Sequence, residues 1–189
     1  MKKKFDVTEY FAAHARLALQ LDAIAFEQGI QMVKEAFEGG KKILTCGNGG
    51  SASTASHYIT DWNKMINLAT GKKFRGVCLS DNVGLVTAYG NDLSYADVFA
   101  GQVDAMMDEG DLLVAVSGSG NSPNILKALG AARRAGGKVL GIVGYDGGKM
   151  KPMCDHNVWV ASFDMQLCED VHLMFGHLVM KTLCGTDIK

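Results

Sequence analysis

The chain has 189 residues, 48% hydrophobic and 21% charged, which is typical of a globular protein and close to the length of one domain. A net charge of −1 provides no basic surface for nucleic acid, and no apolar run reaches the length of a membrane span. The basic N-terminus lacks the apolar stretch of a secretory signal. The five cysteines are odd in number and widely spaced, which favours reduced thiols over disulfides or a thiolate zinc site. We therefore expect one cytoplasmic domain over residues 1–189, with no nucleic-acid or membrane partner.

The first predicted element is a long helix over residues 8–38. Its apolar residues, among them Leu17, Leu19 and Leu21, cover more than one stripe of the helix surface. Such a helix is either buried centrally or shared with another subunit. Because it precedes the sheet, we favour the second interpretation and expect residues 1–40 to include an oligomerisation helix.

Short apolar runs then alternate with stretches of helical periodicity. The alternation predicts a parallel sheet covered by helices on both faces, with ligands bound beyond the carboxyl ends of the strands. The predicted strands are 42–46, 75–79, 112–116, 138–143 and 157–161, and the predicted helices lie near 51–66, 81–88, 95–107, 122–135 and 165–184.

Two turns rich in glycine and serine each follow a predicted strand and precede a predicted helix, at residues 47–53 and 117–124. In the second turn, Ser122 is placed to cap the following helix, with Pro123 at its first position. Free backbone amides at a helix start, surrounded by serine hydroxyls, suit a dianionic phosphate. We therefore interpret both turns as parts of a phosphate site, against the alternative that they are merely tight connections.

Two nucleotide motifs fit these turns poorly. Neither turn contains the lysine of a nucleotide-binding P-loop. The dinucleotide fingerprint lacks its third glycine in both turns, although Ala52 is tolerated at that position of the first turn. No acidic residue ends the second strand, which further weakens NAD binding as an alternative.

The turns Gly47-Asn48-Gly49-Gly50-Ser51 and Ser117-Gly118-Ser119-Gly120-Asn121-Ser122 resemble those of the sugar-isomerase (SIS) domain, in particular of phosphoheptose isomerases. The likeness extends over nearly the whole chain. It implies a three-layer α/β/α sandwich with a flavodoxin-like five-stranded parallel sheet, and a homotetramer with active sites between subunits. The implied reaction interconverts sedoheptulose 7-phosphate and D-glycero-D-manno-heptose 7-phosphate through an enediol.

Polar residues gather on two of the predicted helices. His57 and Asp61 are four residues apart and share a helix face, and Gln166, Glu169 and His177 share a stripe of the last helix, bordered by His172. Two histidines with carboxylates suit zinc or a similar divalent ion. Taken alone, His57 and Asp61 are more typical of a solvated helix face than of a metal site, and His172 is equally typical of a hydrogen-bonded interior histidine. His14 and His156 are expected to be surface or structural residues.

The resemblance assigns roles to these residues. It implies a divalent metal, zinc above all, on His57, Asp61, Glu169 and His177, with Asp61 and His177 as the acid/base pair. Asp61 stands where the family has Glu, Glu169 stands where it has Gln, and a family arginine beyond the first acid is unmatched. The substrate and its phosphate would be held by Asn48, Gly49, Gly50, Ser51, Ser117, Gly118, Ser119, Ser122 and Gln166, with Asp92 meeting sugar hydroxyls.

Other members of the same fold family offer the competing interpretations. Some SIS proteins bind phosphosugars as sensors, and one relative of the heptose isomerases is a scaffold that assembles replication-initiator proteins. Retention of His57, Asp61, Glu169 and His177 together favours an enzyme over either. The departures at Asp61 and Glu169 leave open an isomerase of a different sugar phosphate.

Overall fold

Five parallel strands form one sheet in the order β2-β1-β3-β4-β5 in the computed structural model, which describes residues 6–185. This is the flavodoxin-like order that the resemblance implied. Each strand lies within two residues of its predicted bounds. The strands are β1 (Lys42–Cys46), β2 (Arg75–Cys78), β3 (Leu112–Ser117), β4 (Lys138–Val143) and β5 (His156–Trp159).

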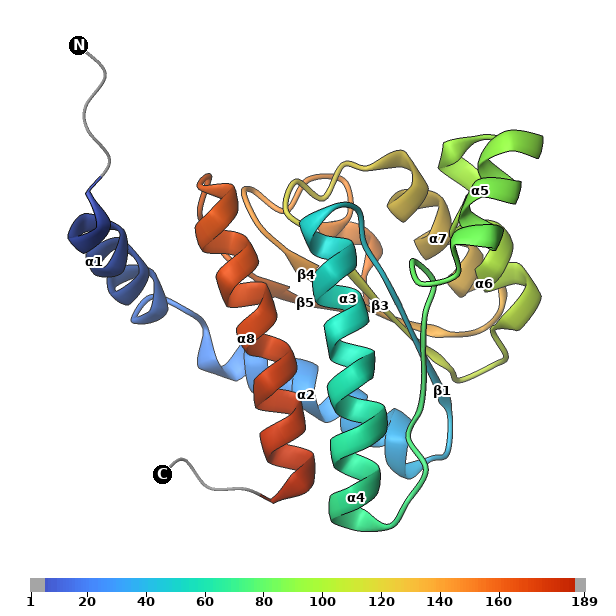
Figure 1. The fold of residues 1–189 in the computed structure, drawn as a ribbon, viewed down its shortest axis with the longest axis horizontal. Coiled ribbons are helices and arrows are strands. Elements are labelled where there is room, and N and C mark those ends of the chain that lie inside the picture. The colour runs from blue at the N-terminus through green and yellow to red at the C-terminus, as the bar shows by residue number, and fades with distance from the viewer. Residues whose placement is uncertain (1–5, 186–189) are drawn as a thin grey trace.

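Helices cover both faces of the sheet, as Figure 1 shows. Side chains of α2 (Ala23–Glu38), α3 (Gly50–Asp61) and α8 (Met165–Cys184) fill the core on one face. Side chains of α6 (Ala100–Met106) and α7 (Pro123–Arg134) fill the core on the other. Every residue of β3 is buried, because this central strand has a helical layer on each side.

The predicted helix over 8–38 is wrong in its continuity. The structure has α1 (Val7–Ala18) and α2, separated by four residues at which the chain changes direction. Asp22 explains the second start, because its carboxylate accepts a hydrogen bond from the amide of Ala25 and caps α2. In Figure 1, α1 lies beside α8 at the edge of the molecule, where the Tyr10 hydroxyl donates to Asp170 at 2.6 Å.

Several predicted helices are subdivided. The helix predicted near 51–66 consists of α3, a π-helix over Trp62–Ile66 and the short α4 (Asn67–Thr70). The segment 95–107 divides into a 3-10 helix (Tyr95–Asp97) and α6, and α5 (Val83–Asp92) is longer than expected. None of the helices within residues 6–185 combines the length and apolarity that crossing a membrane requires.

The helices α3 and α8 run side by side in the same direction and approach closely at Gly176 (Figure 1). A Cβ at Gly176 would lie 2.2 Å from the Tyr58 ring, so only glycine leaves room for that ring. The indole of Trp62 donates to the Gly176 carbonyl at 3.0 Å, and the Tyr58 hydroxyl donates to the carbonyl of His172. Buried aromatic packing and these two hydrogen bonds therefore fix the spacing of the two helices.

We expect Gly176→Ala to lower the free energy of unfolding by about 1–3 kcal/mol, the usual effect of overpacking a filled core. Gly130→Ala in α7 is the matched control, because its Cβ would meet only Arg134, at 3.7 Å. That control should be neutral or stabilising by up to about 1 kcal/mol through helix propensity. Denaturant unfolding of both variants measures the difference. Equal stability of the two variants would show that Gly176 is not needed for close packing.

Candidate active site

Three polar side chains, the triad of His57, Asp61 and His177, meet where α3 and α8 are in contact. The Nε2 atoms of His57 and His177 are 3.1 Å apart. The Asp61 carboxylate lies 3.3 Å from Nε2 of His57 and 3.9 Å from Nε2 of His177. Both rings are half-exposed, so ligands can reach them. The structure therefore brings together three of the four residues expected to bind a metal.

The spacing of these three atoms fits a small divalent ion. Ligand atoms about 2.0–2.1 Å from a tetrahedral zinc ion lie about 3.3–3.4 Å from one another. The observed separations of 3.1, 3.3 and 3.9 Å are close to that edge length. Imidazole nitrogen and carboxylate oxygen are also ligands that zinc accepts. The three side chains are thus arranged as part of a metal site, and a tetrahedral ion would keep a position for another ligand.

Glu169, the fourth expected ligand, lies elsewhere in the structure. A Cβ on Gly50 would lie 2.3 Å from its Oε1, which places the carboxylate over the first residue of α3. Glu169 is eight residues from His177, a rise of about 12 Å along the helix. Its charge therefore sits at the positive end of the α3 dipole, where a carboxylate is stabilised. Repulsion between Asp61 and Glu169 consequently gives no reason for a cation.

The first glycine turn links β1 to α3 through backbone that requires glycine. Gly49 has φ +54°, and a Cβ on Gly47 would lie 2.3 Å from the Ser51 carbonyl oxygen. No side chain caps the start of α3, which leaves its first amides without a side-chain acceptor. Ser51, in the first turn of the helix, is 5% exposed. This turn offers a ligand mainly backbone groups.

The second turn, after β3, directs its serines differently. The Ser117 hydroxyl oxygen accepts from the Gly120 amide at 3.1 Å, and that of Ser119 accepts from the Asn121 amide at 3.3 Å. A hydroxyl that accepts from the backbone has its own proton left to donate. Ser122 is the N-cap of α7 and Pro123 follows it, as predicted, but the Ser122 hydroxyl makes no capping bond. The hydroxyls of Ser117, Ser119 and Ser122 are thus potential donors to an anion.

The two turns lie together at the switch point of the sheet. They follow β1 and β3, which are hydrogen-bonded neighbours whose connections lead in opposite directions. The side-chain amides of Asn48 and Asn124 join them, with Nδ2 to Oδ1 distances of 3.0 and 2.8 Å. The Tyr95 hydroxyl donates to the same Asn48 oxygen at 2.9 Å. Asn48, expected among the phosphate ligands, is therefore occupied in connecting the turns.

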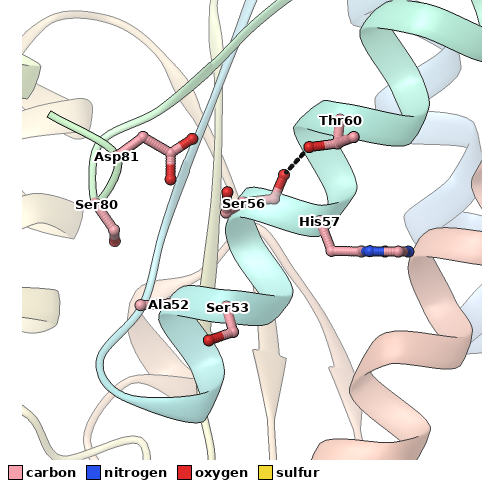
Figure 2. A pocket seen from close by; sticks show the side chains of 7 residues that line it. All are labelled: Ala52, Ser53, Ser56, His57, Thr60, Ser80 and Asp81. Carbon is pink, nitrogen blue, oxygen red and sulfur yellow. Dashed lines mark hydrogen bonds between the residues drawn. The ribbon is translucent and has the colours of Figure 1, made fainter.

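A depression of about 490 Å³ adjoins His57 on the outer side of α3 (Figure 2). Ser53, Ser56 and Thr60 line it from α3, while Ser80 and Asp81 lie across from them on the loop after β2. The His57 ring points away from this loop, toward α8. The polar lining of the depression suits a hydroxylated ligand, but of the three clustered side chains only His57 belongs to that lining.

Two expected substrate residues lie apart from the triad. Asp92 ends α5 and is exposed, with its carboxylate accepting from Asn91 at 2.9 Å. In Figure 1, α5 lies on the opposite side of the molecule from α8. Gln166 is in the first turn of α8, eleven residues before His177. The described chain therefore does not bring Asp92 or Gln166 to the cluster of His57, Asp61 and His177.

The remaining histidines are structural. His172 is 1% exposed, and burial lowers its pKa to about 4, so the ring is neutral at pH 7. The expected interior position is confirmed, although neither ring nitrogen has a hydrogen-bond partner among the described residues. His156 lies 2.7 Å from the Ala25 carbonyl, and His14 lies 3.8 Å from Asp170. All five cysteines are free thiols, as expected.

Sequence analysis missed Asn124 and Tyr95 as partners of Asn48. Asn124 is 2% exposed and lies just inside α7, where an asparagine is unfavourable unless its amide has a specific partner. An asparagine at that helix position was the signal in the sequence that could have revealed a specific partner for Asn124. Nothing in the sequence indicated Tyr95, which reaches Asn48 from a separate 3-10 helix.

In sequence and in structure, the chain is similar to proteins with a SIS domain and to phosphoheptose isomerases. The SIS-domain family matches residues 9–144. A phosphoheptose isomerase from Aliarcobacter butzleri is 35% identical over 179 residues, covering 94% of each chain. The structure of a phosphoheptose isomerase from Neisseria gonorrhoeae superimposes with a TM-score of 0.87 at 30% identity, covering 95% of this chain and 97% of that one. One from Francisella tularensis gives 0.89 at 26% identity with the same coverage.

The sheet order and the two glycine- and serine-rich turns at its switch point agree with the match of residues 9–144 to the SIS domain. The chain belongs to the SIS-domain family and, within it, to the phosphoheptose isomerases, so it is an isomerase.

Proposed function

We propose that residues 1–189 form a single SIS domain that interconverts sedoheptulose 7-phosphate and D-glycero-D-manno-heptose 7-phosphate in the cytoplasm. The observation that supports this function most directly is the cluster of His57, Asp61 and His177, with ligand atoms 3.1–3.9 Å apart. A heptose phosphate as substrate is supported by the name of the phosphoheptose isomerases to which the chain is similar.

The cluster suits proton transfer between neighbouring carbons. Aldose–ketose isomerisation moves a proton between C1 and C2 through an enediol, and needs an acid, a base and stabilisation of an oxyanion. Asp61 and His177 are the acid/base pair in this proposal, reaching the substrate from different helices. Asp61 is about three-quarters buried, which holds its carboxylate beside both imidazoles. Its side chain is one methylene shorter than glutamate, so the sugar must approach α3 more closely.

We propose that His57, Asp61 and His177 hold one divalent ion, zinc above all. A bound ion would occupy the His177 ring nitrogen and the Asp61 carboxylate, so in the loaded site it would polarise the substrate carbonyl and stabilise the enediolate oxygen in place of the acid/base pair. Glu169 would become a fourth protein ligand only if its side chain left Gly50 and turned along α8 toward His177. In its present position the carboxylate instead places a negative charge near the two turns.

The phosphate is assigned to the second turn in preference to the first. Ser117, Ser119 and Ser122 supply hydroxyl donors beside the start of α7, whereas Asn48 is committed to Asn124. The negative charge of Glu169 over Gly50 also disfavours a dianion at the first turn. Neither turn contains lysine or arginine, so neutral donors and the helix dipole would bind the phosphate.

Self-association as a homotetramer completes the proposal. No residue of α5 is buried, although the helix is largely apolar and Val83 is 69% exposed. Phe11 in α1 is 67% exposed, and Leu19, the residue that follows the end of α1, is also exposed. Apolar side chains left open in this way are typical of surfaces that another chain covers. Both helices are therefore assigned to contacts between subunits.

Incubating the purified protein with a panel of ketose phosphates, followed by NMR of the products, tests the reaction. We expect sedoheptulose 7-phosphate to be converted to the aldose. Turnover of another ketose phosphate alone would establish a different substrate, and turnover of none would favour a binding or scaffold protein.

Protein purified without chelator is expected to contain about one zinc-like ion per chain, because three suitable ligand atoms already converge. A His57→Ala, His177→Ala double variant should contain almost none by elemental analysis. His14→Ala is the matched control and should retain the ion, since His14 lies beside Asp170 in another contact. An equal metal content in the double variant would contradict the metal site.

Ser119→Ala should raise the Michaelis constant for the ketose phosphate severalfold, since losing one neutral hydrogen bond costs about 0.5–1.5 kcal/mol. Turnover of the corresponding free sugar, where measurable, should be nearly unchanged because it has no phosphate to lose. Steady-state kinetics with both substrates measure the difference. Equal losses for the two would place Ser119 in the chemistry or the folding.

Val83→Asp combined with Leu93→Asp should shift sedimentation from tetramer toward smaller species, since burying two carboxylates at an apolar contact is costly. Leu68→Asp, an equally exposed apolar position on α4, is the control. Dissociation by the control but not by the α5 variant would place the interface elsewhere.

A further inference from the structure

Residues 144–150, the support loop, follow β4 and form hydrogen bonds with the backbone of the second turn. The Gly144 amide donates to the Gly118 carbonyl at 3.1 Å, and the Met150 amide donates to the Gly120 carbonyl at 2.9 Å. Contact is close, because a Cβ on Gly120 would lie 2.2 Å from the Gly147 oxygen. Of the three consecutive carbonyls of Gly118, Ser119 and Gly120, the first and third therefore accept hydrogen bonds from the support loop.

The middle carbonyl, that of Ser119, is held by a side chain. Asn121 Nδ2 donates to it at 2.9 Å, and Asn121 Oδ1 accepts from the Lys149 amide of the support loop at 3.1 Å. One side-chain amide therefore bridges the turn and the loop. This bridge is separate from the pairing of Asn48 with Asn124, which joins the two turns on their other side.

The hydrogen bonds to these three carbonyls also fix the orientation of the backbone amides of the turn, because each carbonyl shares a peptide plane with the next amide. In a trans peptide the N–H points opposite to the preceding carbonyl, so the amides of Ser119, Gly120 and Asn121 point away from the partners of those carbonyls. Two of these amides donate to serine hydroxyls, as described above, which leaves the hydroxyl protons for a ligand. Asn121 fixes the Ser119–Gly120 peptide, whose amide donates to the Ser117 hydroxyl, and it thereby also fixes the backbone that carries the Ser119 side chain.

We propose that Asn121 is a positioning residue for phosphate binding, acting through the bridge between Ser119 and Lys149. The inference rests on the proposed assignment of the phosphate to the second turn. Asn121 acts by holding the peptide that presents the Ser119 hydroxyl, and its own side-chain donor and acceptor are both used in doing so.

Two variants separate the halves of the bridge. Asn121→Ala removes both hydrogen bonds, whereas Asn121→Asp keeps an acceptor for the Lys149 amide but replaces the donor to Ser119 with a second acceptor. Asn121 is exposed, so both variants are expected to fold. Asn67→Ala is the matched control, since Asn67 also donates to a loop carbonyl, that of Lys72, at 3.0 Å.

The experiment measures the Kd of inorganic phosphate by calorimetry and the exchange rates of backbone amides by NMR, on the full chain. We expect both Asn121 variants to weaken phosphate binding about three- to tenfold, the range for one neutral hydrogen bond. Exchange of the Lys149 amide should accelerate in Asn121→Ala and stay slow in Asn121→Asp. In kinetics, KM for the ketose phosphate should rise with kcat nearly unchanged, and Asn67→Ala should match the wild type.

Three results would overturn the inference, and the first two are distinguishable from failure of the proposed phosphate site, which is the third. An unchanged phosphate Kd in Asn121→Ala, with the Lys149 amide exchanging rapidly, would refute the role of Asn121 alone. A fall in kcat without a rise in KM would show that Asn121 supports the chemistry or the fold instead. An unchanged Kd in Ser119→Ala would refute the phosphate assignment itself, and the role of Asn121 with it.

Discussion

The close contact between α3 and α8 at Gly176 is the constraint on which the active site depends. Tyr58 and Gly176 pack against each other, and each is the immediate neighbour of a histidine in the triad. The packing that seats the Tyr58 ring over Gly176 therefore also brings His57 and His177 within 3.1 Å. Because the aromatic core determines this distance, the exposed side chains need no further support from one another to stay together.

The second constraint is the sheet order, which places the ends of β1 and β3 side by side. Each strand end leads into a turn whose backbone needs glycine, and asparagine side chains then fix the turns to their surroundings. Asn48 and Asn124 connect one turn to the other, while Asn121 connects the second turn to the loop after β4. Neutral amides thus preorganise the proposed phosphate site, in which neither turn contains lysine or arginine.

The two acidic departures from the family pattern have different consequences. Asp61 keeps the position of the family's glutamate beside both histidines, with a shorter reach. Glu169 places a full negative charge over the first residue of α3, where the helix dipole stabilises it. The same charge makes the edge of the first turn less favourable for phosphate, which agrees with the proposed assignment of the phosphate to the second turn.

Local signals in the sequence determined much of the architecture. Short apolar runs alternating with helical periodicity placed all five strands within two residues, and Ser122 followed by Pro123 marked the start of α7. The break between α1 and α2 was missed because the apolar pattern continues through it, and the Asp22 cap was the deciding local signal.

The candidate site was only partly visible in the sequence, for a physical reason. Spacing along one helix showed that His57 and Asp61 share a face, since neighbouring turns bring such residues together. Spacing could not show that Glu169 points to Gly50 while His177 meets His57, because that depends on how far α8 is displaced along α3. Nor could it show that Asn48 is occupied by Asn124, 76 residues away. Local patterns predicted the strands, the two turns and the types of donor. Tertiary packing settled which donors meet, because contacts between distant segments depend on the relative positions of whole helices.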